Sequence, residues 1–254
     1  MAATLVVATS AGALDLFTLW QRPELPLNLA AGLRADYRRQ ALTEGRRTDD
    51  LLRVQCLGRD AAGRWVLEVL PLVEVAPDSL AVVPGEGLRL HLSRRFEERR
   101  GNLSEAVAEV VLWRDGQMSR LDEQEWRQDP LVTASFSGDF VPQTVTERAP
   151  TVRVIGTREL TCRQLEFAAA DTQRARLPAG TMVQISSQEV AAAVHPDIPL
   201  LGLAYVTERL RAESHLEPAS DRFPPPPLQL RVEMLECLGF GRDARPWLGP
   251  FTAD

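Results

Sequence analysis

Three histidines are the side chains of this chain best suited to acid–base chemistry, and they are widely separated. His91 lies on the polar side of an alternating stretch, His195 stands in a connector flanked by prolines, and His215 precedes a proline tract. None belongs to an HExxH pattern or stands beside a nucleophile signature. Solvated or structural roles are therefore favoured over a general base.

The cysteines and basic residues restrict the chemistry further. Cys56, Cys162 and Cys237 show no CxxC spacing and form no cluster with histidine, which argues against a zinc site. All 29 positions counted as lysine or arginine are arginine. Lysine is thus not available as a Schiff-base nucleophile or as the cation of a phosphate loop. The sequence predicts neither a metal nor another cofactor.

Carboxylates are abundant but do not define an active site. The closest pairs are Asp49–Asp50, Glu97–Glu98 and Glu123/Glu125. Such pairs could serve glycoside or phosphate chemistry, yet these lie among arginines, at turns or at a helix start, as solvated faces do. GxSxG, a phosphate loop and a dinucleotide fingerprint do not occur. We predict a protein that is not an enzyme, with carboxylate chemistry as the third-ranked class.

Length and charge limit the partners. With 254 residues, a net charge of −6 and a pI near 5.3, the chain can build a large core but has no global basic field for nucleic acid or an anionic membrane. No run of 18 or more apolar residues predicts a membrane span. The sequence predicts no nucleic-acid partner and no membrane-spanning segment.

The first thirteen residues resemble a short signal peptide. Residues 2–8 are apolar, and Ala11-Gly12-Ala13 has the small-x-small form of a signal-peptidase site, so cleavage is expected before Leu14. Residues 14–254 then form one β-rich domain in the periplasm or otherwise outside the cytoplasm. If the segment is not cleaved, it is an ordinary N-terminal strand of a cytoplasmic protein.

Alternation of apolar and polar residues predicts about nine to eleven strands. It is clearest in 33–38, 52–56, 65–73, 88–96, 159–163, 183–186 and 228–234, and a Gly/Asp turn at 58–63 joins two strands as a hairpin. Residues 103–113 fit a helix or a strand, and we favour a strand. The apolar run Leu200–Val206, entered through Pro196 and Pro199, is predicted to be a central strand with a close backbone approach at Gly202.

A short helix interrupts the strands. Asp122 can cap it, Glu123 and Glu125 suit its positive end, and Leu121 can pack against Trp126. Residues 131–142 could form a second helix, and residues 224–227, all proline, are predicted to be a polyproline spacer. The fold class is mainly β, an α+β variant rich in strands. We expect a curved antiparallel sheet, a half-barrel, with one or two short helices in its concavity.

Several stretches together resemble the lipoprotein-carrier (LolA/LolB-like) half-barrel superfamily of exported bacterial proteins. They are Gly32-Leu-Arg-Ala-Asp-Tyr37, Gly63-Arg-Trp-Val-Leu-Glu68, the mid-chain helix, Glu159-Leu-Thr-Cys162 and Asp197-Ile-Pro199-Leu-Leu-Gly202. In that superfamily a curved sheet wraps around short helices, and its concave apolar face holds acyl chains. The resemblance implies the same fold and an acyl or lipid ligand here.

Two functions follow as hypotheses. The first is non-enzymatic binding of an apolar ligand, a lipid or acyl chain, inside a half-barrel of the bacterial cell envelope. The alternative is a protein-interaction or assembly module that binds an envelope protein and no small ligand. The residues expected to line the apolar ligand are Trp65, Leu67, Leu88, Leu90, Leu201, Leu203 and Tyr205.

Overall fold

A computed structural model describes residues 19, 22–43, 45–77, 79–93, 106–128, 142–177, 180–217 and 228–251. Antiparallel strands dominate these ranges, and the short helix α4 (Glu123–Gln128) follows the seventh strand. The strands are β1 (Arg34–Thr43), β2 (Arg46–Arg59), β3 (Trp65–Ala76), β4 (Ser79–Val82), β5 (Gly87–Leu92), β6 (Val107–Arg114), β7 (Gln117–Asp122), β8 (Thr144–Ile155), β9 (Arg158–Leu177), β10 (Gly180–Val194), β11 (Leu203–Glu217) and β12 (Gln229–Gly241).

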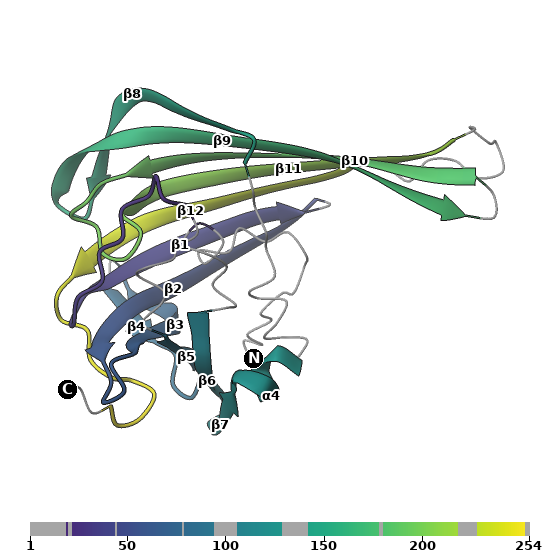
Figure 1. The fold of residues 1–254 in the computed structure, drawn as a ribbon. Coiled ribbons are helices and arrows are strands. Elements are labelled where there is room, and N and C mark those ends of the chain that lie inside the picture. Colours follow the sequence, from purple (N-terminus) through teal and green to yellow (C-terminus); the bar gives the residue numbers. More distant parts are fainter. Residues whose placement is uncertain are drawn as a thin grey trace.

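These strands form one sheet, in the order β7-β6-β5-β3-β2-β1-β12-β11-β10-β9-β8, with β4 beside β3. The first and last strands are neighbours, since β1 pairs with β12 from Arg34 opposite Gly241 to Thr43 opposite Arg231. This pairing joins the β2–β7 half to the β8–β11 half. The sheet is strongly curved and does not close, because β7 and β8 form its two edges (Figure 1). The expected curved antiparallel sheet is confirmed.

The two faces of the sheet differ in chemistry because side chains alternate along each strand. One face carries apolar side chains that lie opposite one another on neighbouring strands. Val54 is opposite Val69, and Leu67 is opposite Leu90. Helix α4 adds the buried Trp126 to the same core. The opposite face carries charged residues, among them Glu68 opposite Arg89. The bend of the sheet encloses the apolar face.

Helix α4 begins as its sequence predicts. Asp122 and Glu125 form a reciprocal capping box: the Glu125 N–H donates to Asp122 Oδ1 and the Asp122 N–H donates to Glu125 Oε2, each at 2.9 Å. Leu121 and Trp126 both pack against the main core. Residues 103–113 fitted a helix or a strand, and residues 107–113 lie in strand β6, which confirms the favoured interpretation for them; residues 103–105 lie outside the described ranges.

The run Leu200–Val206 is only partly a strand. β11 begins at Leu203, whereas Leu200 has a φ of 66° and is held by paired backbone hydrogen bonds with Asn28. Gly202 has a φ of 67°, and a Cβ there would clash with Pro26 and lie 2.8 Å from the His195 carbonyl oxygen. The close approach at Gly202 is confirmed, but the first three residues belong to the connector. β11 itself is an interior strand, as expected, and runs on to Glu217.

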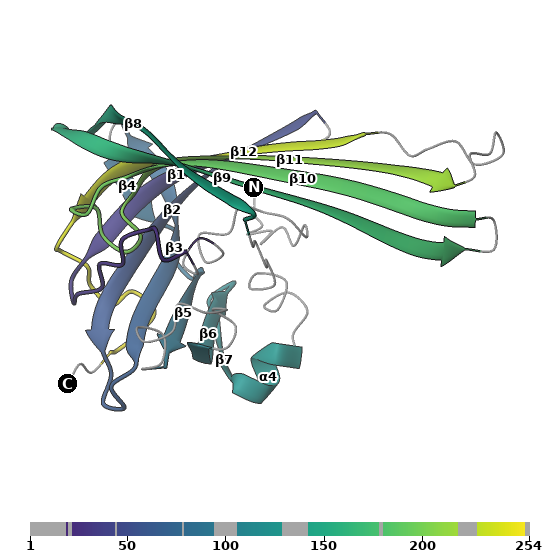
Figure 2. The ribbon, with the colours of Figure 1, turned by 45° about the horizontal axis from the view of Figure 1, so that its top comes forward.

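The far ends of β9, β10 and β11 extend as an arm. We define the arm as residues 169–177, 180–188 and 210–217, which continue beyond the pairing of Gln188 with Leu210. At about 3.4 Å per residue, nine residues of strand span about 30 Å. Both ribbon views show the arm reaching past the ends of β1 and β2 (Figures 1 and 2).

The last described segment crosses the charged face of the sheet. Residues 243–251 follow β12, and Leu248 packs there against Leu70, Leu72 and Val82 in a second, smaller core. A Cβ at Gly87 would lie 2.9 Å from Leu70 Cδ2 and 3.1 Å from Leu248 Cδ2. The C-terminal segment is therefore packed closely against the convex side.

Three sequence predictions fall outside the described residues. They are the signal peptide 1–13, the second helix at 131–142 apart from Pro142, and the polyproline spacer 224–227. In the ranges that are described, no helix is long and apolar enough to cross a membrane.

Candidate functional site

The predicted ligand-lining residues are mostly core residues. Trp65, Leu67, Leu90, Leu201 and Leu203 are all buried and belong to one hydrophobic cluster with Trp126. Leu88 and Tyr205 are half-buried. The structure thus gathers the seven around one core, and their role in binding a ligand stays a prediction.

Tyr205 packs against this core from a different side than Leu203, because of an irregularity in β11. Tyr205 pairs with Ala193 and Leu203 with Val194, so Ala204 is an extra residue on β11. Tyr205 alternates with the buried Val206 and points to the opposite face. There its ring lies 4.3 Å from the guanidinium of Arg153, and its hydroxyl is 3.0 Å from Met234 Sδ.

The apolar face is incompletely buried along one row. Val69 is opposite Leu88, and Leu88 is opposite Leu112, so the three side chains share a face of β3, β5 and β6. Each is half-buried, as is Leu52 on β2. We call Leu52, Val69, Leu88 and Leu112 the apolar row. Of its members, only Leu88 was among the predicted lining residues. Strand alternation marked Leu52 and Val69 as apolar, but it could not show which strands are neighbours.

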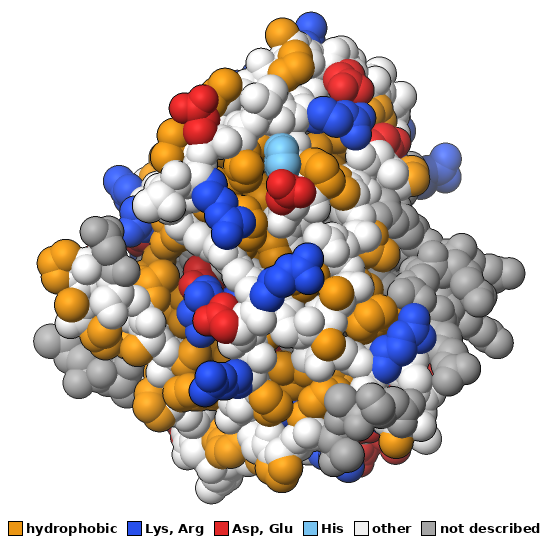
Figure 3. All heavy atoms as spheres, turned by 90° about the vertical axis from the view of Figure 1, so that its left-hand side faces the viewer, with side chains coloured by type: hydrophobic (Ala, Val, Ile, Leu, Met, Phe, Trp, Pro, Cys, Tyr) orange, Lys and Arg blue, Asp and Glu red, His pale blue; other side chains and the backbone are white. Residues whose placement is uncertain are grey.

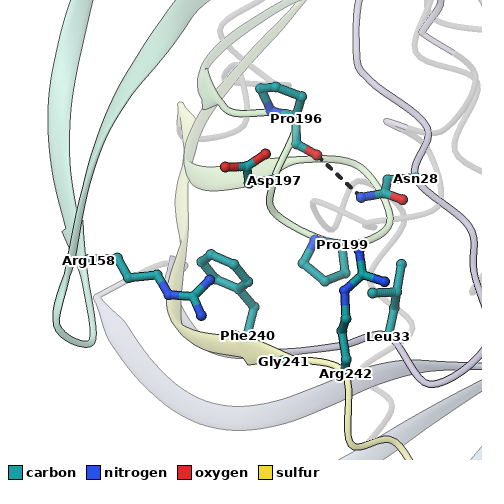
Figure 4. Close-up of a pocket in the computed structure, with 9 residues that line it drawn as sticks. All are labelled: Asn28, Leu33, Arg158, Pro196, Asp197, Pro199, Phe240, Gly241 and Arg242. Atoms are coloured by element: carbon teal, nitrogen blue, oxygen red, sulfur yellow. Dashed lines mark hydrogen bonds between the residues drawn. The ribbon is translucent and has the colours of Figure 1, made fainter.

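A pocket of about 410 Å³ lies at the end of the sheet where β12 finishes and β1 begins. We call it the end pocket. Four segments far apart in the chain form it: the stretch before β1, the start of β9, the β10–β11 connector and the end of β12 (Figure 4). Its lining residues are Asn28, Leu33, Arg158, Pro196, Asp197, Pro199, Phe240, Gly241 and Arg242.

Backbone contacts fix the walls of the end pocket. Asn28 Nδ2 donates to the Pro196 carbonyl oxygen at 3.3 Å, and the Asn28 and Leu200 backbones exchange hydrogen bonds of 2.7 and 2.9 Å. The His195 N–H donates to the Gly202 carbonyl oxygen at 2.8 Å, which closes the connector into a tight loop. The proline-flanked connector is therefore a rigid wall.

Charge and apolar surface are mixed at this end of the molecule. Figure 3 views it directly and shows arginine and acidic side chains among hydrophobic ones. In the pocket the Arg158 guanidinium lies 4.9 Å from the centre of the Phe240 ring, and Arg242 stands beside Pro199 (Figure 4). Asp197 is the single acidic lining residue. Sequence reasoning missed this site because its residues are scattered along the chain.

A second polar cluster lies on the convex face around His91. His91 Nδ1 is 2.9 Å from Asp60 Oδ2, and Arg64 Nε donates to the same oxygen at 2.8 Å. Burial alone would raise the pKa of Asp60, but hydrogen bonds from Arg64 and His91 lower it to about 2. Burial lowers the pKa of His91 despite the carboxylate beside it. These contacts hold the β2–β3 turn in place, and they show a structural role for His91.

The cysteines are free and buried. Burial raises the pKa of the Cys56 thiol to about 11 and that of Cys237 to about 12, so both are protonated thiols at neutral pH. Within the described ranges, no group of three or more His, Cys, Asp or Glu side chains could hold a metal ion. These cysteines have the environment of structural residues.

Comparison with known proteins gives a weak likeness. No protein-family model matches the chain, and no curated protein sequence is similar to it. Among solved structures it resembles a LolA superfamily protein from Nitrosomonas europaea, with 10% sequence identity, a TM-score of 0.29, and coverage of 91% of this chain and 94% of that one. This is a weak resemblance of fold alone.

Proposed function

We propose that the protein is a non-enzymatic binding protein for an apolar ligand, a lipid or acyl chain, held against the concave face of its half-barrel. The observation that supports this most directly is the apolar row. Val69, Leu88 and Leu112 are in register across three strands, Leu52 lies on the same face of β2, and all four remain half-buried. Covering such a surface with an acyl chain is favourable by about 25 cal/mol for each Å² removed from water.

The neighbouring residues support the same site. At the far end of β3, beyond Val69, Val73 and Val75 are 45% and 62% exposed. Val73 has the same strand parity as Val69, so apolar surface continues along β3 toward solvent, and Val75 follows at an irregularity of the strand. A ligand at the apolar row would enter from this end, opposite the end pocket.

Lipid analysis of the native protein tests this proposal. Native mass spectrometry and lipid extraction of protein from its own host should recover a bound lipid, and palmitate at 100 times its dissociation constant should add about 2.7 kcal/mol to the free energy of unfolding. Leu88→Gln should lower both signals, whereas Leu228→Gln, at an exposed leucine outside the row, should leave them unchanged. No co-purifying lipid and no stabilisation by palmitate would refute the proposal.

Export belongs to the same proposal. An acyl-chain carrier of the cell envelope would begin at Leu14 after removal of residues 1–13. Intact-mass measurement of the native protein checks this. Finding Met1 or Ala2 retained on protein from the cytoplasmic fraction would contradict export without touching ligand binding.

The arm favours a second function, binding of a protein partner. Ile185 on the arm and Leu230 at the start of β12 are 43% and 48% exposed, and the edge strand β8 exposes Val152 and Val154. An exposed strand edge can pair with another chain. Stoichiometric co-purification of one envelope protein, lost in Ile185→Glu but kept in Leu88→Gln, would place this function first.

A further inference from the structure

The end pocket combines two arginines with little opposing charge. Arg158 and Arg242 both line it, and neither has an ion pair or a hydrogen bond from its side chain to another described residue. Asp197 is the one acidic lining residue, so the lining charges sum to two positive and one negative. The Asp197 side chain is 71% exposed. This local positive site belongs to a chain whose net charge is −6.

The two arginines suit an oxyanion better than a cation or an apolar group. An arginine guanidinium presents parallel N–H donors that match the oxygens of a carboxylate or a phosphate. The Phe240 ring holds the Arg158 guanidinium at 4.9 Å, which restricts the arginine before any ligand binds. Arg242 approaches from the end of β12, on the other side of that ring (Figure 4).

The backbone keeps this arrangement in place. Asp243, the residue after Arg242, accepts a hydrogen bond of 2.6 Å from Arg34 Nε, and the Ala244 N–H donates to the Gly32 carbonyl oxygen at 2.9 Å. These contacts anchor the chain on which Arg242 is carried, while Arg242 itself remains available. The volume of about 410 Å³ lies in the range of roughly 300 to 1,000 Å³ that ligand sites occupy.

We propose that the end pocket binds the oxyanion group, phosphate or carboxylate, of a small ligand between Arg158 and Arg242. This inference is separate from the apolar-ligand function, because the end pocket and the apolar row share no residue. A free phosphate compound and an anionic lipid head group offer the same chemistry. The experiment must distinguish these two sources.

Titration calorimetry with inorganic phosphate at low salt, and flotation with vesicles of phosphatidylglycerol or phosphatidylcholine, together test the proposal. Arg158→Gln and Arg242→Gln should each weaken binding by about tenfold or more, as expected for loss of a charge-assisted hydrogen bond. Both side chains are exposed, so the variants should fold with unchanged melting temperature. Arg114→Gln, at an exposed arginine outside the pocket, is the matched control.

The outcomes are distinct. Binding of inorganic phosphate that depends on Arg158 and Arg242, without retention on vesicles, assigns a soluble oxyanion ligand. Retention on phosphatidylglycerol but not phosphatidylcholine vesicles, with the same dependence, assigns a lipid head group. Binding to neither probe, or an equal loss in Arg114→Gln, overturns the proposal. Because Leu88→Gln tests the apolar row by itself, failure here leaves that function standing.

Discussion

Glu68 and Glu208 are both buried glutamates within strands of one sheet, yet their surroundings differ. Glu68 on β3 is 0% exposed and Glu208 on β11 is 2% exposed. Glu68 lies on the convex face beneath the C-terminal segment, whereas Glu208 lies at the root of the arm, opposite Glu233 of β12. The comparison shows that burial alone does not define the role of a carboxylate.

The Glu68 carboxylate accepts five hydrogen bonds. Its Oε1 accepts from Arg89 Nε and Nη2 at 2.9 and 2.6 Å and from the Leu248 N–H at 3.2 Å. Its Oε2 accepts from Gln55 Nε2 at 2.7 Å and the Trp247 N–H at 3.1 Å. A buried charge is tolerated when it is paired and fully hydrogen-bonded. Glu68 therefore fastens the C-terminal segment to three strands.

Glu208 has fewer partners. Its Oε1 accepts from Gln188 Nε2, but Oε2 has no hydrogen-bond partner among the described residues. Burial raises the pKa of Glu208, and the hydrogen bond from Gln188 and the charge of Arg231 offset only part of that effect. The two glutamates differ in how many hydrogen bonds their carboxylates accept more than in how deeply they are buried. Glu68 is a structural anchor, and Glu208 is a weak point at the root of the arm.

The largest expected effect is at Glu68. Glu68→Gln should lower the free energy of unfolding by about 3 to 5 kcal/mol, because it leaves the Arg89 charge buried without its partner. Urea unfolding at pH 7 measures this, with Glu74→Gln at an exposed position of β3 as the control. A loss below about 1 kcal/mol would show that the network contributes little.

A smaller effect is expected in the apolar contact of the same C-terminal segment. Leu248→Ala should cost about 2 to 3 kcal/mol, since it opens a cavity against Leu70 and Leu72. Val75→Ala, at a valine that is 62% exposed, should change the stability by less than about 0.5 kcal/mol. Equal effects of the two substitutions would mean that the segment is not packed on the sheet in solution.

The sequence predicted the elements of the fold better than their spatial relations. Alternation identified β2, β3 and β12, and the cap Asp122 with the acidic residues Glu123 and Glu125 identified α4, because these signals are local. The extra residue Ala204 reversed the expected side of Tyr205, since a bulge leaves no mark in an alternating pattern. The end pocket and the pairing of Glu68 with Arg89 depend on segments joined only by the sheet, so no local pattern could reveal them.

The smallest effect is expected at Glu208, and its sign is opposite to that at Glu68. Because the pKa of Glu208 is raised in the folded protein, the folded state binds more protons than the unfolded state above the ordinary pKa of about 4.5. Its contribution to stability is therefore present at low pH and is lost as the pH rises through the folded pKa. Glu208→Gln removes this loss of stability at high pH. It also keeps a side-chain oxygen that can accept the hydrogen bond from Gln188.

Glu208→Gln should consequently leave the protein as stable as the wild type near pH 4.5, and at pH 8 more stable by about 1 kcal/mol or less. Urea unfolding of both proteins across this range isolates the effect, because other titrating groups cancel in the difference. Glu189→Gln, at an exposed glutamate 4.0 Å from Arg209, is the control substitution. A variant less stable than the wild type at pH 8 would mean that the charged carboxylate is compensated, and the contrast between the two glutamates would then fail.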